Sequence, residues 1–424
     1  MSKKVIVIGA GASGMAAAVS AAASGAEVTV LEGMKKPGRK LLLTGSGRCN
    51  LTNTDPGLAS AYGSLGNGTW RDEPFVYPAV SANGAAATLQ FFEEIGVTAR
   101  CQDGYVYPAS GQAQTVLSAL EAEMHRLRIK TKYNSRVIAL GRDEETGLWS
   151  VSVDGWSYKA DAVILCCGSM AAPQTGSDGS GYALARSVGH TVTEIRPALT
   201  ALLVSDSDLK IAAGARTRAS VRLISEASSC VSPPETGEVQ WNENAVSGIA
   251  VFQLSRMAGD LLKGGPVRLI TDLVPGRTAE EVEMSIRRMR AHFGGKMTPG
   301  AVLCGFMHDR VASYIERRLK REGLLGDGSY GESPDAAQLA EYIKSVTLDV
   351  TGLRSFEQAQ CARGGVSLDE VRSETLESRI SPGLYFAGEI LDIDGPCGGY
   401  NLQWAWSSGF LAGRSAANHE KTRT

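Results

Sequence analysis

The chain has 424 residues, 43% of them hydrophobic and 21% charged, and its 43 basic and 45 acidic side chains leave a formal net charge of −2. The length predicts two or three domains, and the composition is that of a folded globular protein. A charge so near to neutral gives no reason to expect a nucleic-acid partner. No stretch of about 18 uninterrupted apolar residues occurs, so we expect no membrane span.

Eight cysteines are distributed along the chain, and none belongs to a C-x-x-C pair. This spacing argues against zinc ribbons and thioredoxin-type redox centres, and we expect no metal site. We expect reduced, mostly buried thiols in a cytoplasmic protein. The Ala-rich stretch after Lys4 resembles a secretory signal, but its three glycines and the strand-like sequence that follows favour a nucleotide-binding fold.

The residues up to Glu32 follow the pattern of a dinucleotide-binding β-α-β unit. An apolar run at 4–8 predicts a buried parallel strand, the small residues of 13–24 predict a helix, and 27–31 predict a second strand. Glu32 ends that second strand at the distance from the glycines where a carboxylate accepts hydrogen bonds from ribose hydroxyls.

The turn between the first strand and the helix reads G-x-G-x-x-G. Gly9 permits the tight turn, Gly11 lets the backbone approach a pyrophosphate, and Gly14 allows the helix to pack closely on the strand. Unpaired N–H groups and the dipole at the helix start then attract the phosphates. The expected cofactor contacts in this unit are Gly9, Gly11, Ala12, Ser13, Gly14, Glu32 and Gly33.

The nucleotide-binding domain continues to about residue 190. A structured loop is predicted at 35–53, because Gly, Arg, Lys and Asn are abundant there. Hydrophobic spacing predicts helices at 82–96 and 112–128 and, with a hairpin turn at Asp154-Gly155, strands at 135–141, 148–154 and 156–165. The segment Gly176 to Gly181 resembles a phosphate loop, but no clear strand precedes it, which favours a helix-capping loop.

Between about 190 and 350 the pattern changes to short alternating strands and then to a charged helical block from Thr278 to about Arg321. After residue 355 the Gly-rich, strand-then-helix pattern returns, so we interpret the middle as an inserted module. The predicted division is a nucleotide-binding domain at 1–190 and 353–424, an inserted β domain at 191–276 and 340–352, and a helical subdomain at 277–339.

The C-terminal segment decides between FAD and NAD. Residues 384–389 (LYFAGE) predict a strand that runs into Gly-Glu, near the chain end where FAD enzymes place a second contact to the pyrophosphate and ribityl chain. Residues 398–401 (GGYN) then open a helix, whose N-terminus suits the negative charge on the N1–C2=O edge of a reduced flavin. A plain helix-entry turn is the alternative for these glycines. Together with the N-terminal turn, the pattern favours FAD.

Three blocks carry a family resemblance: 38–53 (GRKLLLTGSGRCNLTN), 364–366 (GGV) with Glu377-Ser378 downstream, and 383–413. In these blocks the chain resembles the YhiN/BaiN-type FAD-binding flavoproteins, also described as aminoacetone-oxidase-like or NAD(P)/FAD-dependent oxidoreductases. The blocks lie at the two ends of the chain, so the resemblance spans essentially its whole length.

The resemblance implies an α/β fold: a Rossmann-like FAD-binding domain of glutathione-reductase-like type, an inserted β-barrel-like domain and a small helical domain. It implies that Arg48, Cys49 and Asn50 approach the flavin ring or ribityl chain and that Lys40 approaches the phosphates. The further expected FAD contacts are Arg39, Ser46, Gly47, Val137, Gly168, Gly388, Glu389, Gly399, Tyr400, Asn401 and Leu402. Members are associated with amine oxidation and with NAD(P)H-linked reduction of steroid-type enones.

The chain departs from the family pattern at two places. Residues 242–245 (NENA) stand where many members have Thr-His-x-Gly, and Ala362-Arg363 stand where Thr and a small residue are usual. Both departures bear on the substrate and leave the FAD contacts intact. Arg363 is either an anchor for a substrate anion or a solvated surface residue.

A flavin performs the redox chemistry, and the protein supplies orientation, electrostatics and a proton donor. The catalytic candidates are Tyr400, as a proton donor or a packing ring, together with Arg48 and Cys49. No cysteine follows Cys49 within five residues, which favours a non-redox thiol. No second nucleotide domain is evident, so NAD(P)H would bind transiently over the flavin.

The sequence therefore predicts an FAD-dependent oxidoreductase that transfers hydride between the flavin and a small organic substrate, with NAD(P)H-linked reduction of an enone or steroid-type substrate as one reaction. An FAD-dependent amine oxidase that uses oxygen is an alternative, and a flavin-dependent RNA-modifying or RNA-binding protein is an alternative of another class. We expect the substrate between the nucleotide-binding domain and the inserted module. The substrate, the nicotinamide preference and the oligomeric state stay open.

Overall fold

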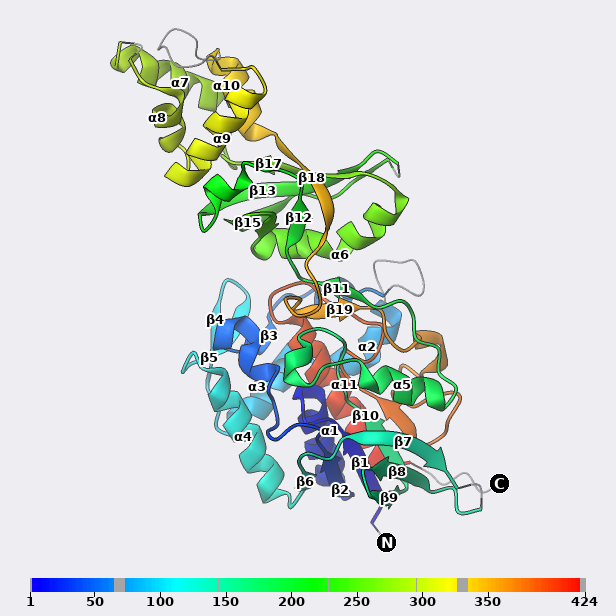
Figure 1. The fold of residues 1–424 in the computed structure, drawn as a ribbon. Helices are drawn as coiled ribbons and strands as arrows, with labels where there is room; N and C mark the ends of the chain where they lie inside the picture. The colour runs from blue at the N-terminus through cyan, green and yellow to red at the C-terminus, as the bar shows by residue number, and fades with distance from the viewer. Residues whose placement is uncertain are drawn as a thin grey trace. The chain divides into compact units, whose positions relative to one another are not determined.

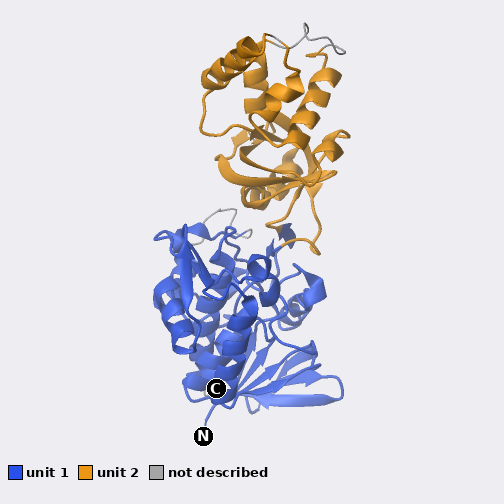
Figure 2. Cartoon of the chain, turned by 90° about the vertical axis from the view of Figure 1, so that its left-hand side faces the viewer, with its two compact units in different colours: residues 1–197, 360–424 blue, residues 198–359 orange. Residues whose placement is uncertain are grey.

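The computed structural model describes residues 2–64, 73–143, 145–227, 229–294, 296–325 and 335–419. The chain forms two compact units, residues 1–197 with 360–424 and residues 198–359, which Figure 2 distinguishes by colour. Each unit has a hydrophobic core of its own. The first unit is therefore discontinuous in sequence, and residues 277–339 fall within the second unit.

A five-stranded parallel sheet forms the centre of the first unit (Figure 1). Its strand order is β20 (Leu384–Phe386), β10 (Ala162–Leu165), β1 (Lys4–Ile8), β2 (Glu27–Leu31) and β6 (Lys130–Lys132). Every side chain of β10 and β20 is buried, as expected for parallel strands that are covered on both faces. The first and last segments of the chain thereby enter one sheet.

Helices α1 (Ala12–Ala23) and α11 (Tyr400–Ala417) pack against each other and against the central strands. Glycines make this approach close: a Cβ atom on Gly409 would lie 2.5 Å from the Ser13 carbonyl oxygen, and one on Gly413 would lie 2.2 Å from the Ala17 carbonyl oxygen. Most residues of α11 are buried. The small residues of α1, which the sequence placed in a nucleotide-binding helix, also allow this helix pair.

Two three-stranded antiparallel sheets and several helices complete the first unit. One sheet has the order β3 (Thr52–Asn53), β5 (Tyr105–Pro108), β4 (Ala99–Gln102), and the other β7 (Val137–Arg142), β8 (Trp149–Val153), β9 (Trp156–Ala160). The remaining elements are η1 (Leu41–Gly47), η2 (Leu58–Ala61), α2 (Glu73–Ala82), α3 (Ala85–Glu94), α4 (Ala113–Arg126), η3 (Pro173–Thr175), α5 (Ser180–Ser187), β11 (Arg196–Ala198), β19 (Cys361–Arg363) and η5 (Leu368–Glu370).

The single strand expected at 156–165 is two strands in different sheets. β9 pairs with β8 in a hairpin, whereas β10 pairs with β1 and β20. Between them, Asp161 donates its N–H to the Lys4 carbonyl (2.9 Å), and its carboxylate accepts the Lys4 N–H (2.9 Å). The chain leaves one sheet for the other at Asp161, where the sequence has no glycine or proline to mark the change.

The second unit contains a closed antiparallel barrel of six strands. The ring runs β13 (Arg216–Ser225), β15 (Glu235–Trp241), β16 (Ala245–Ser247), β12 (Leu202–Val204), β18 (Val346–Leu353) and β17 (Val267–Asp272), and β17 pairs with β13 to close it. Alternate side chains of β13 are buried inside it. The expected β-barrel-like insertion is confirmed. The other elements are η4 (Leu209–Ala212), β14 (Cys230–Val231), α6 (Ile249–Gly264), α7 (Ala279–His292), α8 (Pro299–Cys304), α9 (Asp309–Arg321) and α10 (Ala336–Lys344).

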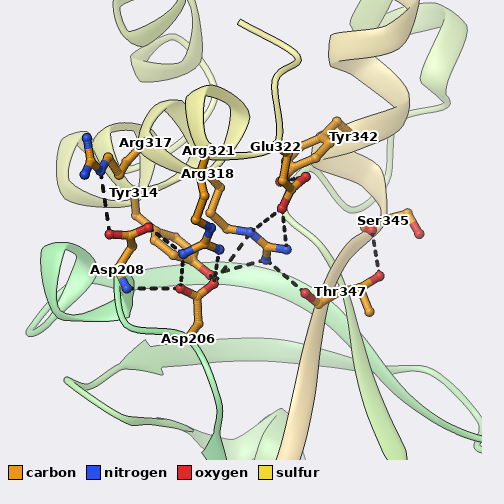
Figure 3. A network of polar contacts seen from close by, with 10 residues as sticks. All are labelled: Asp206, Asp208, Tyr314, Arg317, Arg318, Arg321, Glu322, Tyr342, Ser345 and Thr347. Atoms are coloured by element: carbon orange, nitrogen blue, oxygen red, sulfur yellow. Dashed lines mark hydrogen bonds and ion pairs between the residues drawn. The ribbon is translucent and has the colours of Figure 1, made fainter.

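A polar network joins helix α9 to the loop after β12 (Figure 3). Asp206 accepts hydrogen bonds from Arg321 (2.9 Å) and from the Tyr314 hydroxyl (2.9 Å), and its side chain is 4% exposed. Arg318 donates to the Thr347 carbonyl on β18 (2.9 Å). These contacts and one continuous hydrophobic core attach the helices to the barrel.

Within the described ranges, no helix is both long and apolar enough to cross a bilayer. Over the same residues, no cluster of His, Cys, Asp and Glu has an arrangement that would hold a metal ion.

Candidate functional site

The glycine turn has the geometry expected of a phosphate loop. Gly9 has φ +101°, and a Cβ atom there would lie 2.6 Å from the Cys166 carbonyl oxygen. A Cβ atom on Gly14 would lie 1.9 Å from the Gly9 carbonyl oxygen. A Cβ atom on Gly11 would meet no described atom within 4 Å. Gly9 and Gly14 are therefore required by the fold, whereas Gly11 borders open space where a ligand can approach the backbone.

Helix α1 begins at this turn without a capping side chain. Its N-cap, Gly11, offers no side-chain acceptor, and no acidic residue lies in the first turn of the described helix. The first N–H groups of a helix have no partner within the helix, and they carry the positive end of its dipole. The turn is thus suited to an anionic group such as a pyrophosphate.

Glu32 is held at the end of β2 by two backbone groups. Its Oε2 atom accepts the Ala10 N–H (2.7 Å), and its Oε1 atom accepts the Met34 N–H (2.8 Å). The residue is partly exposed. A carboxylate in this position keeps lone pairs for ribose hydroxyls, because each oxygen accepts more than one hydrogen bond.

Lys40 and Glu389 connect the two ends of the chain. The Lys40 ammonium lies 2.5 Å from Glu389 Oε2, and the Ser169 hydroxyl donates to the same oxygen (2.9 Å). Gly388, the preceding residue, has φ +78°, and a Cβ atom there would lie 2.5 Å from Ser13 Oγ. The Gly-Glu segment therefore lies directly against the glycine turn. Ser169 was missed by sequence reasoning, since no motif marks it.

The loop around η1 has an unusual run of left-handed residues. Gly45, Ser46, Gly47 and Cys49 all have φ between +56° and +84°. Arg48 is exposed, donates from Nε to the Gly45 carbonyl (3.1 Å) and stacks over the Tyr107 ring at 4.9 Å. Successive N–H groups in such a turn can form an anion-binding concavity. Arg48 therefore presents an exposed guanidinium whose Nε atom is held by the Gly45 carbonyl.

Cys49 and Asn50 point into the protein. Cys49 is fully buried, and burial raises the pKa of its thiol to about 12. A neutral thiol is a poor nucleophile at physiological pH. The Asn50 amide donates to the Val106 and Thr52 carbonyls and accepts the Gly399 N–H (3.2 Å). Asn50 thereby ties the loop to the start of α11.

Tyr400 opens α11 after Gly399, whose φ is +99°. Its hydroxyl donates to Asp55 Oδ2 (2.8 Å), and its ring lies edge-on to Tyr62 with 6.3 Å between the centroids. Burial and the hydrogen bond to Asp55 raise the pKa of Tyr400 well above its ordinary range. Asp55 and Tyr62 were not identified from the sequence, because nothing in their spacing connects them to residue 400.

The other residues expected to contact FAD lie on several different segments of the first unit. Gly168 has φ +72° beside Ser177, and Gly33 lies near Arg136. Val137 is a buried residue at the start of β7. Arg39 is exposed, while Leu402 and Asn401 are half-buried in the first turn of α11.

Arg363 is not a solvated residue. Its side chain is 4% exposed, and Nε lies 3.1 Å from Oδ1 of Asp394, whose side chain is 1% exposed. The surface alternative is therefore wrong. The segment Gly176 to Gly181 is a helix-capping loop, in which Asp178 accepts the Ser180 N–H (3.1 Å) at the start of α5.

The chain is an FAD-dependent oxidoreductase, the class expected from the sequence. The features that fit this class are a Rossmann domain, a phosphate turn near one end of the chain and a Gly-Glu segment near the other. The chain belongs to the HI0933-like protein Rossmann domain family, which matches residues 3–415.

Two relatives illustrate the range of named activities. The 3-dehydro-bile acid delta(4,6)-reductase of Clostridium scindens is 38% identical over 422 residues, which cover 98% of this chain and 99% of the relative. The ribosomal RNA dihydrouridine synthase of Escherichia coli is 27% identical over 419 residues, 95% of each chain.

Among solved structures, the chain is similar in fold to 3-ketosteroid delta1-dehydrogenase from Sterolibacterium denitrificans, with a TM-score of 0.52 and 12% identity over 99% of this chain and 100% of that one. A second is 3-ketosteroid-delta4-(5alpha)-dehydrogenase from Rhodococcus jostii, with a TM-score of 0.50 and 17% identity over 98% and 97%. At these identities the likeness is one of fold.

Proposed function

We propose that this protein reduces a carbon–carbon double bond conjugated to a carbonyl group in a steroid-type small molecule. The observation that carries the proposal is the 38% identity to a delta(4,6)-reductase, which extends over 98% of this chain. The aligned region includes both halves of the nucleotide site. Reduction of a conjugated double bond adds a hydride to the β-carbon and a proton to the α-carbon.

The residues fit FAD. The uncapped start of α1 and the open space beside Gly11 would hold the pyrophosphate, and Glu32 would accept the ribose hydroxyls. Bound FAD, once reduced by a nicotinamide, would supply the hydride. The ammonium of Lys40 is already paired with Glu389, so we assign Lys40 to the orientation of the Gly-Glu segment rather than to a direct phosphate contact.

Tyr400 is better suited to positioning than to proton donation. Its hydroxyl proton is engaged by Asp55, and a phenol whose pKa is raised is a weaker acid. Cys49 is buried as a neutral thiol, so we assign it to packing. Arg48 is exposed at the loop tip, and we propose that its guanidinium contacts the substrate or the flavin edge.

The test begins with reconstitution of the purified protein with FAD. Anaerobic addition of NADH or NADPH then shows which nicotinamide reduces the flavin, and oxygen is admitted separately. The proposal expects reduction by one nicotinamide and slow reoxidation by oxygen. Rapid peroxide formation with an amine as the reductant would instead support the amine-oxidase alternative.

A second candidate is reduction of a uracil ring in RNA. The relatives named ribosomal RNA dihydrouridine synthase support it, because the reduced double bond of uracil is also conjugated to a carbonyl. Arg216, Arg218 and Arg222 also form a row of exposed side chains on β13. Salt-sensitive retention of the protein on ribosomal RNA, abolished by R218E/R222E, would favour this candidate.

A further inference from the structure

A buried ion pair connects two segments of the first unit that lie 31 residues apart in the chain. Arg363 ends β19, and Asp394 lies in the loop before α11. The two side chains are 4% and 1% exposed. Desolvating two charges is costly unless their contacts are well formed, so a pair this deeply buried constrains the segments that carry it.

The same guanidinium reaches a third segment. Its Nη2 atom donates to the Ser64 carbonyl (2.9 Å). Gly63 and Asp394 exchange two backbone hydrogen bonds, both 3.0 Å long. Arg363 therefore lies where β19, residues 63–64 and the Asp394 loop meet.

Both segments that the Arg363 guanidinium contacts are also hydrogen-bonded to the first turn of α11. On one side, Gly395 donates its N–H to Asn401 Oδ1 (2.9 Å), and Asn401 Nδ2 donates to the Gly395 carbonyl (2.9 Å). On the other side, the Tyr62 hydroxyl donates to the Tyr400 carbonyl (2.8 Å). The guanidinium thus contacts Asp394, one residue before Gly395, and Ser64, two residues after Tyr62, so both of its contacts lie close in sequence to a support of the same helical turn.

We propose that Arg363 is a positioning residue that fixes the first turn of α11, and with it the flavin-facing backbone at Gly399 to Asn401. The Asp394 carboxylate neutralises its guanidinium, so Arg363 acts within the protein and does not anchor a substrate anion. The inference rests on the proposed FAD site for its consequence, but the constraint on the helix start is a property of the protein without cofactor.

The test compares R363M and R363K with the wild type and with R126M, which removes an exposed ion pair of α4. Hydrogen exchange is measured on the cofactor-free protein, followed by FAD affinity and the visible spectrum of the bound flavin. For R363M we expect faster amide exchange at residues 395–403 and unchanged exchange in β1 and α1. We also expect FAD affinity about tenfold weaker and a shifted flavin spectrum, with partial recovery in R363K.

Exchange at 395–403 that matches the wild type in folded R363M would overturn the proposal, whether or not FAD binds. If R363M fails to fold, R363K and D394N decide in the same way, since each keeps a polar side chain at the site. Failure of the wild type to bind FAD, with the exchange effect intact, would refute the proposed function and leave the positioning role standing.

Discussion

The Lys40 ammonium lies 2.5 Å from the Glu389 carboxylate, so a loop near the start of the chain is fixed to a segment near its end. Both side chains are less than a quarter exposed. Because Gly388 packs on the glycine turn, this contact also sets the distance between the two halves of the nucleotide site.

Replacing Lys40 with Met should therefore weaken FAD binding by about tenfold, since Glu389 loses the cation that orients it. Fluorescence titration of the apoprotein with FAD measures the effect. R126M, which removes a surface pair, is the control and should bind FAD as the wild type does. Equal affinities of K40M and the wild type would contradict this account of the pair.

Two glycines of the same turn should respond to alanine in opposite ways. G14A places a methyl group 1.9 Å from the Gly9 carbonyl oxygen, so it should lower the free energy of unfolding by about 1–3 kcal/mol or more. G11A meets no described atom, so it should keep the stability of the apoprotein and lose FAD affinity. Thermal unfolding without cofactor and FAD titration separate the two effects. A G11A protein that binds FAD normally would place the pyrophosphate elsewhere.

Removal of the Tyr400 hydroxyl should slow substrate reduction less than removal of a general acid would. Loss of a general acid costs about 10²–10⁴ in rate, whereas we expect Y400F to slow substrate reduction by less than about tenfold. Because the pKa of Tyr400 is raised, the phenol stays neutral from pH 6 to beyond its ordinary value of about 10. The rate should therefore show no titration of this group between pH 6 and pH 9. A loss near 10³-fold in stopped-flow measurements of Y400F would restore it as the proton donor.

Asp206 should stabilise the barrel unit in a pH-dependent way. Burial opposes its ionisation, but hydrogen bonds from Arg321 and the Asp208 N–H prevail and lower its pKa (Figure 3). Its contribution is therefore complete above the unfolded-state pKa of about 4 and is lost as the pH falls through the lower folded-state value. D206A should destabilise the protein by about 1–3 kcal/mol at pH 7, because it leaves the buried Tyr314 hydroxyl without its acceptor and leaves Arg321 with Asp208 as its remaining carboxylate partner. Urea unfolding at pH 7 and pH 3 measures this, and an equal deficit at both pH values would contradict the assignment.

The parts of the site that depend on backbone geometry could be predicted from the sequence more fully than the parts that depend on contacts between distant side chains. Gly9 and Gly14 follow from steric rules that a motif expresses, so their roles in the turn could be predicted from spacing alone. The contacts of Lys40 with Glu389 and of Tyr400 with Asp55 depend on side chains that are 349 and 345 residues apart, and no local pattern contains them. Burial of Arg363 was likewise invisible, because its partner Asp394 becomes a neighbour only after the chain has folded.

The central claim is tested most directly by a single half-reaction. FAD-loaded protein is reduced anaerobically, mixed with a steroid that carries a double bond conjugated to a 3-keto group, and followed through the flavin absorbance. The account predicts reoxidation of the flavin with one equivalent of the saturated ketone formed. A flavin that stays reduced with such enones, yet is rapidly reoxidised by oxygen or by a uracil-containing RNA, would contradict it.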